Sequence, residues 1–502
     1  MVALRESLAL ALAVLAVYGA SIAAPFQFDD YAILGDPVLN SASGWLDVWR
    51  PLQTRPLTYF TFWLIQEPGG GSPAAHHALS LILHLAATLL LWDVLARRIP
   101  RRAALVAAAL FALHPIQSEA VVYVFARGTL LMTVFCLLSL RAWTLGRRWP
   151  AVAWFAGALL AKEECAAFPL FLLLLHFSGS RNAAELRPIA AMLGLSVAAG
   201  LRAVFATIVL PGTAAGPQAG ISASWYLAAQ GTVILRYFRL LAVPWGFTVD
   251  PDVRVPALWL SLLAWSLIAA AVWLALRRFG NLRAGFWMLA GLVLLLPSSS
   301  VFPAADLAAD RRMYLPMCAF AAGIALLLRN MRLRYLAPAG LVVAALCFGR
   351  VLVWGSSESL WTEAVRRAPA KVRPKVHLAR AVGPKRGLTL LEEAKRLAPD
   401  DAVMAAELGR IHMQLGDTPR ALAEFGRALA LAPQSAQALN NRGAALSALG
   451  QLEPAREDIA RALAIDPCLF DARLNALRLG LQPPEPRGCR FSDEQRLLLQ
   501  TP

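Results

Sequence analysis

Long apolar runs recur through the first 354 residues of the chain and then stop. Each run is long enough, or nearly so, for an α-helix to cross the hydrocarbon core of a bilayer, which takes about 20 residues. With 58% of its 502 residues hydrophobic and 16% charged, the chain is not a soluble globular protein. We predict an all-α, polytopic membrane domain over residues 1–354, with runs at 4–24, 77–96, 103–122, 126–145, 188–210, 256–276, 284–302, 313–328 and 336–354.

Short basic clusters between the apolar runs indicate how the helices are oriented. Lysine and arginine are concentrated in the cytoplasmic loops of membrane proteins. Such clusters lie at residues 97–102, 147–148, 181–187, 277–283 and 329–334. They hold most of the excess behind the net charge of +16, which therefore does not indicate nucleic-acid binding. The pattern places the N-terminus inside and the C-terminus outside.

The stretch 150–178 is interrupted at its middle by Lys162, Glu163 and Glu164. Because the basic clusters on both sides of it belong in the cytoplasm, the stretch has to cross the membrane to the outside and then cross back. We therefore predict two short helices with the three charges at the outer tip, which gives about 11 spans in all. A cleaved signal peptide is the alternative for the first run, whose end contains small residues.

Two of the predicted outer loops are long. Residues 25–76 carry tryptophan, tyrosine and phenylalanine at spacings that suggest amphipathic helices in the membrane interface. Residues 211–255 contain a semi-apolar segment with Arg236 and Tyr237 that has to begin and end outside. We expect an interfacial or re-entrant helix there.

The tail over residues 355–502 has an internal period. Pro399, Pro433 and Pro467 are spaced by 34 residues, the period of tetratricopeptide repeats (TPRs), and small and large packing residues recur at matching positions. The tail is therefore predicted to be an α-solenoid. Such an array binds a protein or peptide, or only packs against a neighbour, and both remain open.

The six cysteines show no spacing that suggests a metal site. Four of them lie in or beside apolar runs and are expected to be core residues. The other two, Cys468 and Cys489, lie in the tail. They form one disulfide if the tail is outside the cell, or they are two free thiols.

Charged residues assigned to the outer face gather near helix ends. Asp29 and Asp30 directly follow the first apolar run, and acids so close to hydrocarbon usually mark a site. Arginines on this face work against the positive-inside bias, and a membrane-embedded phosphate would explain them, because guanidinium groups bind phosphate through paired hydrogen bonds. The remaining members of the set are His114, Glu119, Arg127, Lys162, Glu163, Glu164, Arg311 and Arg312.

A carboxylate and a phosphate site on one membrane face suit a sugar transfer. An aspartate acts as general base on an acceptor hydroxyl, and cations stabilise the phosphate that leaves. Without a nucleotide-binding glycine loop in the chain, a lipid-linked sugar fits better than a nucleotide sugar. Structural explanations of these residues stay open. The aspartates cap the next helix or pair with Arg50 or Arg55, Arg127 pairs with Glu119, and a backbone carbonyl satisfies His114. Lys162–Glu164 form a solvated tip, and Asp306 and Asp310 hold Arg311 and Arg312.

Several motifs, taken together and in order, resemble the transmembrane and tetratricopeptide-repeat O-mannosyltransferases and their bacterial relatives. Departures are Asp310 and Ser80, where the family usually has glutamate and asparagine. The motifs are Phe28-Asp29-Asp30, the stretch from His77 to His84, the stretch 114–121 followed by Arg127-Gly128, Lys162-Glu163, and Ala309 to Pro316.

The resemblance implies a GT-C-type membrane domain that transfers a mannose-like sugar from a polyprenyl phosphate to hydroxyl groups of exported proteins. By position, Asp30 or Asp29 is the catalytic carboxylate, with a slight preference for Asp30 because it lies deeper in the loop. The donor lipid phosphate would be held by Arg127, Lys162, Arg311, Arg312 and His114, with Glu119, Glu163, Asp310 and His77 in support.

The predicted setting is the inner membrane of a bacterium, with the repeat domain on the periplasmic side. The expected partners are the lipid-linked sugar as co-substrate, membrane lipids and a protein acceptor that the repeats help to capture, without nucleic acid, metal or a further cofactor. Two other functions remain: sugar transfer to a lipid or cell-wall glycan, and a non-catalytic membrane scaffold or transporter subunit that uses the repeats for assembly.

Overall fold

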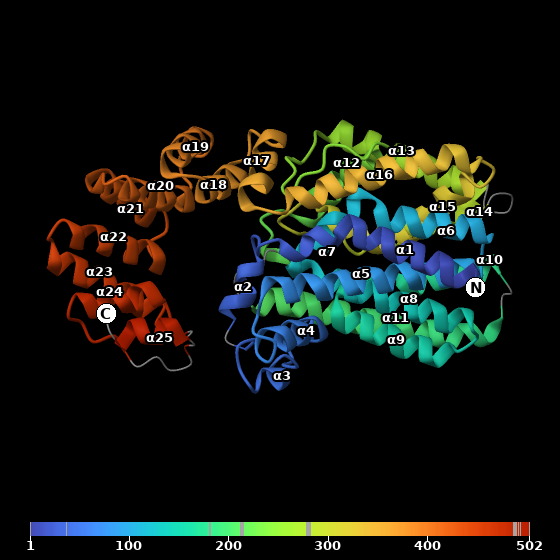
Figure 1. Cartoon of the computed structure of the whole chain (residues 1–502), viewed down its shortest axis with the longest axis horizontal. Helices are drawn as coiled ribbons and strands as arrows, with labels where there is room; N and C mark the ends of the chain where they lie inside the picture. The colour runs from blue at the N-terminus through green and yellow to red at the C-terminus, as the bar shows by residue number, and fades with distance from the viewer. Residues whose placement is uncertain are drawn as a thin grey trace. The chain divides into compact units, whose positions relative to one another are not determined.

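The computed structural model describes residues 2–36, 38–179, 182–210, 215–277, 283–484, 489, 491 and 493–500. Every regular element in these ranges is a helix, as predicted, and the described residues contain no strand beyond an isolated bridge between Ala215 and Ala304. The chain divides into two compact units, Met1–Ser356 and Ser357–Pro502 (Figure 1). The predicted basic clusters at 181–187 and 277–283, and the loop 211–255, fall partly outside the described residues.

Within the described residues, six helical segments of the first unit are long and apolar enough to cross a bilayer. They make the chain a membrane protein, but they do not confirm the predicted count of about 11 spans. A seventh is added if the bent pair Arg101–Leu113 and Pro115–Val122, which turns by 50°, counts as one span. The six segments are Leu4–Ala23, Pro73–Ala96, Val124–Thr144, Ala183–Val209, Leu258–Arg277 and Arg334–Val353, which contain helices α1 (Val2–Tyr18), α5 (Pro73–Ala96), α8 (Arg127–Thr144), α11 (Leu186–Val209), α13 (Leu258–Arg277) and α16 (Leu333–Val353).

The remaining apolar helices of the first unit are shorter, which is why the count falls below the prediction. They are α6 (Arg101–Leu113), α9 (Arg148–Ala161), α10 (Phe168–Ser178), α14 (Arg283–Leu295) and α15 (Tyr314–Leu327).

The break predicted inside the stretch 150–178 is confirmed. Helix α9 ends at Ala161, Lys162 is extended, and a single 3-10 turn, η4 (Glu163–Cys165), precedes α10. Pro169 lies in the first turn of α10, where a missing backbone N–H leaves no helical bond unmade.

The two long loops that are predicted to be outside fold against the helix ends. Residues 25–76 form α2 (Asp30–Gly35), α3 (Gly44–Asp47) and α4 (Pro56–Gln66), whose apolar side chains share a small core with Val124. The loop 211–255 contains α12 (Ala223–Ala242), which buries Tyr226 and Tyr237. Two short elements complete this end of the unit: α7 (Ser118–Val122) and the 3-10 turn η7 (Asp310–Met313).

The second unit is an array of paired helices, in agreement with the predicted solenoid. Small residues of each repeat pack against large ones. A Cβ at Gly409 would lie 2.5 Å from the ring of Phe425, and a Cβ at Gly443 would lie 2.9 Å from the side chain of Ile459. A disulfide joins Cys468 and Cys489. The helices are α17 (Ser357–Arg367), α18 (Val372–Ala381), α19 (Pro384–Leu397), α20 (Ala402–Gln414), α21 (Thr418–Leu431), α22 (Ala436–Ala448), α23 (Leu452–Ile465), α24 (Phe470–Arg478) and α25 (Asp493–Gln500).

Candidate functional site

The two adjacent aspartates have different surroundings. Asp30 is buried, and its carboxylate accepts hydrogen bonds from the backbone N–H groups of Phe125 (2.7 Å) and Gln27 (3.0 Å). Burial raises the pKa of Asp30 to about 7, although these bonds and the charge of Arg127 oppose the rise. Asp29 is half-buried, and its carboxylate accepts a 2.8 Å bond from the hydroxyl of Tyr123. Asp29 is therefore the more accessible of the two.

Tyr123 connects Asp29 with the arginines of η7. The guanidinium carbon of Arg311 lies 5.9 Å from the centroid of the Tyr123 ring, within cation–π range. Arg311 also donates a 2.5 Å bond to Glu119 of α7, and the other oxygen of Glu119 accepts the backbone N–H of Asp310 at 3.0 Å. Burial alone would lower the pKa of Arg311, but the carboxylate of Glu119 outweighs it and raises that pKa. Asp29, Glu119 and Arg311 thus form one connected group.

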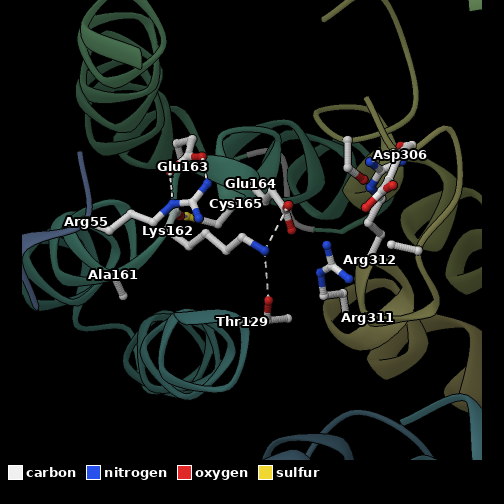
Figure 2. Close-up of polar contacts among 12 residues, drawn as sticks. Arg55, Thr129, Ala161, Lys162, Glu163, Glu164, Cys165, Asp306, Arg311 and Arg312 are labelled. Atoms are coloured by element: carbon white, nitrogen blue, oxygen red, sulfur yellow. Dashed lines mark hydrogen bonds and ion pairs between the residues drawn. The ribbon is translucent and has the colours of Figure 1, made fainter. Parts of the chain in front are cut away.

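The tip between α9 and α10 contributes a second group of charges (Figure 2). Lys162 is buried, and its ammonium donates to Thr129 at 2.9 Å and pairs with Glu164 at 2.9 Å. Arg55 makes a two-pronged ion pair with Glu163. Burial alone would raise the pKa of Glu163, but the charge of Arg55 lowers it to about 2. Figure 2 shows the Lys162 side chain extending toward the side on which Arg311 and Arg312 lie.

Arg312 and Asp310 tie η7 to α12. Arg312 is buried and donates to the backbone carbonyls of Asp306 (2.6 Å) and Leu307 (3.0 Å) and to the hydroxyl of Tyr226 (3.2 Å). Asp310 pairs with Arg236 at 2.6 Å. Most donors of Arg312 are occupied, whereas Arg311 makes its hydrogen bond to Glu119 through one nitrogen, and its side chain stays 27% exposed. We call these residues together the charged cluster: Asp29, Arg55, Glu119, Lys162, Glu163, Glu164, Arg311 and Arg312.

A pocket of about 310 Å³ opens beside the charged cluster. Its polar side is formed by Arg55, Glu163, Glu164, Arg312 and Tyr226. Its apolar side comes from membrane helix α11, through Gly200, Ala203 and Val204, and from Pro297 and Phe302 beyond α14. A ligand with a charged head and an apolar chain would match both sides.

Three residues predicted to belong to the site lie away from any open surface. Arg127 is fully buried and donates to the ring nitrogen (2.9 Å) and the carbonyl (3.1 Å) of His76, with its guanidinium over the ring of Phe62. His77 and His114 are also buried. None of the three is among the residues that line the pocket.

The glycine after Arg127 has a steric reason. A Cβ at Gly128 would come within 3.1 Å of the Thr58 hydroxyl and 3.3 Å of the carbonyl of Ala161. The start of α8 is therefore packed closely against α4 and the end of α9.

Sequence reasoning missed three residues that hold the cluster together: Tyr123, Thr129 and Tyr226. It considered Arg55 only as a partner of the aspartates, and the structure pairs Arg55 with Glu163 instead. Tyr123 follows the motif at 114–121 by two positions, and only this proximity could have indicated that Tyr123 belongs to the site. Among the described residues, no group of three or more His, Cys, Asp or Glu is arranged to hold a metal ion.

Fold and site together define an all-helical membrane protein with a repeat domain and a partly open charged cluster at its helix ends. The chain is similar to the protein O-mannosyl-transferase F38B6.6 of Caenorhabditis elegans, at 25% identity over 73% of this chain and 58% of the relative. It is also similar to the Drosophila melanogaster protein O-mannosyl-transferase Tmtc2, at 30% identity over 48% of this chain and 30% of the relative. Models described as TPR repeat and tetratricopeptide repeat match residues 409–450 and 436–467.

These relatives confirm the resemblance to the transmembrane and tetratricopeptide-repeat O-mannosyltransferases. The chain spans less than two thirds of the length of each relative named above. Among solved structures, the crystal structure of MamA covers 28% of this chain at 20% identity with a TM-score of 0.23, which is too low to support an argument.

Proposed function

We propose that this chain is a membrane glycosyltransferase that moves a mannose-like sugar from a polyprenyl phosphate to hydroxyl groups of a protein acceptor. The observation that carries the proposal is the charged cluster, where the partly exposed carboxylate of Asp29 and the partly exposed guanidinium of Arg311 flank one tyrosine. The names of the relatives support sugar transfer to protein.

The step we propose needs one base and one cationic leaving-group site. Asp29 takes the proton of a serine or threonine hydroxyl, the hydroxyl oxygen attacks the anomeric carbon, and the bond from that carbon to the phosphate oxygen breaks. Polyprenyl phosphate leaves with the electron pair, and Arg311 and Lys162 stabilise its charge. The reaction balances without a further reactant.

We assign the base to Asp29 and not to the initially preferred Asp30. Both oxygens of Asp30 are occupied by backbone N–H groups, and its side chain is sealed from solvent. A buried carboxylate so held fixes the loop that carries Asp29. Under this assignment Asp29 is the base and Asp30 holds the loop that carries it.

We assign the donor to the pocket beside the charged cluster. The cations that line this pocket are Arg55 and Arg312. Arg311 and Lys162 belong to the neighbouring charged cluster and keep unused donors, because Glu119 occupies one nitrogen of Arg311 and two of the three donors of Lys162 are used. The apolar wall of α11 then takes the start of the prenyl chain. Arg127 and His114, predicted as phosphate ligands, support the loops from behind under this assignment.

The acceptor is proposed to reach the site from the outer face of a bacterial inner membrane, where the repeats help to hold it. TPR arrays bind peptides along their stacked helices, and two models of this repeat match the second unit.

The test compares Asp29→Asn, Asp30→Asn and Asp47→Asn in purified full-length protein. Asp47 lies in the same outer loop, outside the charged cluster, and serves as the control. Transfer of radiolabelled mannose from undecaprenyl-phosphate mannose would be measured to a threonine-rich peptide and, in parallel, to a lipid acceptor. We expect Asp29→Asn to lose at least about 100-fold in rate, with the control unchanged. Full activity of Asp29→Asn would overturn the assignment, and transfer to the lipid alone would overturn the protein acceptor.

A further inference from the structure

Tyr123 makes two hydrogen bonds to the same aspartate. Its hydroxyl donates to one carboxylate oxygen of Asp29 at 2.8 Å and accepts the backbone N–H of Asp29 at 3.2 Å. The two residues are 94 positions apart in the sequence, so the contact is set by the fold and not by the local chain. It fixes both the backbone and the side chain of Asp29 with one group.

The turn that carries Asp29 needs such a restraint. Phe28, the preceding residue, has a φ of 49°, in the left-handed region that a phenylalanine rarely adopts. The double contact with Tyr123 holds the chain directly after this strained residue. Without it the carboxylate would lose the one side-chain donor that orients it.

The ring of Tyr123 is itself held in place. It is buried, it stacks on Trp354 at a centroid distance of 5.9 Å and 27°, and Arg311 lies over it. Burial, followed by the charges of Asp29 and Asp30, raises the pKa of Tyr123 far above its ordinary range. The phenol is therefore protonated at neutral pH and able to donate.

The bond uses one of the two carboxylate oxygens of Asp29. Within the described part of the chain, no hydrogen bond reaches the other oxygen. The half-exposed side chain thus has one oxygen anchored to the protein and one available to an incoming hydroxyl.

We propose that Tyr123 is a positioning residue for the reaction, which anchors one oxygen of Asp29 and aims the other at the acceptor. The inference rests on the proposed function with Asp29 as base.

The test is Tyr123→Phe, which keeps the ring against Trp354 and Arg311 and removes only the hydroxyl. Tyr335→Phe is the matched control, because its hydroxyl accepts a bond from Arg334 on an exposed part of α16, outside the charged cluster. The probes are undecaprenyl-phosphate mannose and a threonine-rich peptide, with kcat and KM measured at pH 7. Thermal unfolding in detergent checks that both variants are folded.

We expect Tyr123→Phe to lower kcat by at least about 10-fold with KM for the peptide unchanged. An unchanged kcat, with Asp29→Asn inactive, would overturn this inference and leave the proposed function standing. A lower kcat accompanied by a similar rise of KM for the peptide would make Tyr123 a packing or binding residue and would also overturn it. Full activity of Asp29→Asn would overturn the assignment of the base, and no sugar transfer by the parent chain would overturn the proposed function itself.

Discussion

The ion pair between Arg55 and Glu163 joins two segments far apart in the sequence, and its removal has a calculable effect on stability. Arg55 precedes α4, Glu163 lies at the tip between α9 and α10, and the two side chains bond through both carboxylate oxygens. The variant we consider is Glu163→Gln. It keeps the size of the side chain and removes its charge.

The pKa of Glu163 gives the upper limit of the effect. A carboxyl whose pKa falls from 4.5 to about 2 on folding stabilises the folded state by no more than about 3 kcal/mol when it is ionised. The side chains of Arg55 and Glu163 are 34% and 26% exposed, so solvent screens the pair. We reduce the figure to about 1–2 kcal/mol for this reason.

The pH dependence follows from the direction of the shift. Because the pKa of Glu163 is lower in the folded state, the stabilisation is fully present above about pH 4.5 and is lost as the pH falls toward 2. Glu163→Gln should therefore be less stable than the parent chain at pH 7 and nearly equal to it near pH 2.

The assay is unfolding of the full chain in mixed detergent micelles, followed by tryptophan fluorescence, from pH 2.5 to 7.5. Asp252→Asn is the control, because Asp252 pairs with a largely exposed arginine and should change stability by less than about 0.5 kcal/mol. A Glu163→Gln variant as stable as the parent chain at pH 7 would refute the reasoning. So would a difference that does not shrink in acid.

Three further predictions follow from the site and the repeat domain. Gly200→Leu should raise KM for the lipid donor several-fold, because Gly200 lines the pocket and a larger side chain there would fill part of it. Gly194→Leu on the same helix, where there is also open space, should leave this KM unchanged. Equal KM values for the two variants would refute the donor assignment. Because the pKa of Asp30 is raised to about 7 in the folded state, the protein should lose stability as the pH rises from about 4 through 7. Asp30→Asn should flatten this part of the plot of stability against pH. A plot for Asp30→Asn that runs parallel to that of the parent chain would contradict the argument from burial. Reduction of the Cys468–Cys489 disulfide, which closes a loop of 21 residues, should destabilise this segment by about 3 kcal/mol and speed its digestion in limited proteolysis of the full chain. Cys468→Ala should have the same effect without reductant. Unchanged digestion would refute the stabilising role of the disulfide.

Sequence patterns were sufficient where the cause is local. The charges at 162–164 broke the apolar stretch into α9 and α10 because three ionisable side chains are costly in the middle of a membrane helix. The 34-residue period predicted the paired helices because each repeat carries its own small and large packing positions. Both features can be read within a few turns of helix.

The parts that could not be predicted depend on contacts between distant segments. Arg127 looks like a surface cation in the sequence, but Phe62 and His76 enclose it, and they lie 65 and 51 positions earlier in the chain. The hydroxyl of Tyr123 reaches Asp29 across 94 positions. Apolar length alone also did not establish the number of spans, because several of the apolar runs fold as helices of 11 to 14 residues in the described part of the chain.

The charged cluster carries as many negative groups as positive ones: Arg55, Lys162, Arg311 and Arg312 against Asp29, Glu119, Glu163 and Glu164. Such a balanced set produces little electric field beyond its own neighbourhood, so it does not concentrate free anions from the surrounding water. Under the proposed donor assignment, discrimination therefore falls to the apolar side of the pocket, which favours an anion attached to a chain already dissolved in the membrane. We expect inorganic phosphate and soluble sugar phosphates to be poor competitors for such a site.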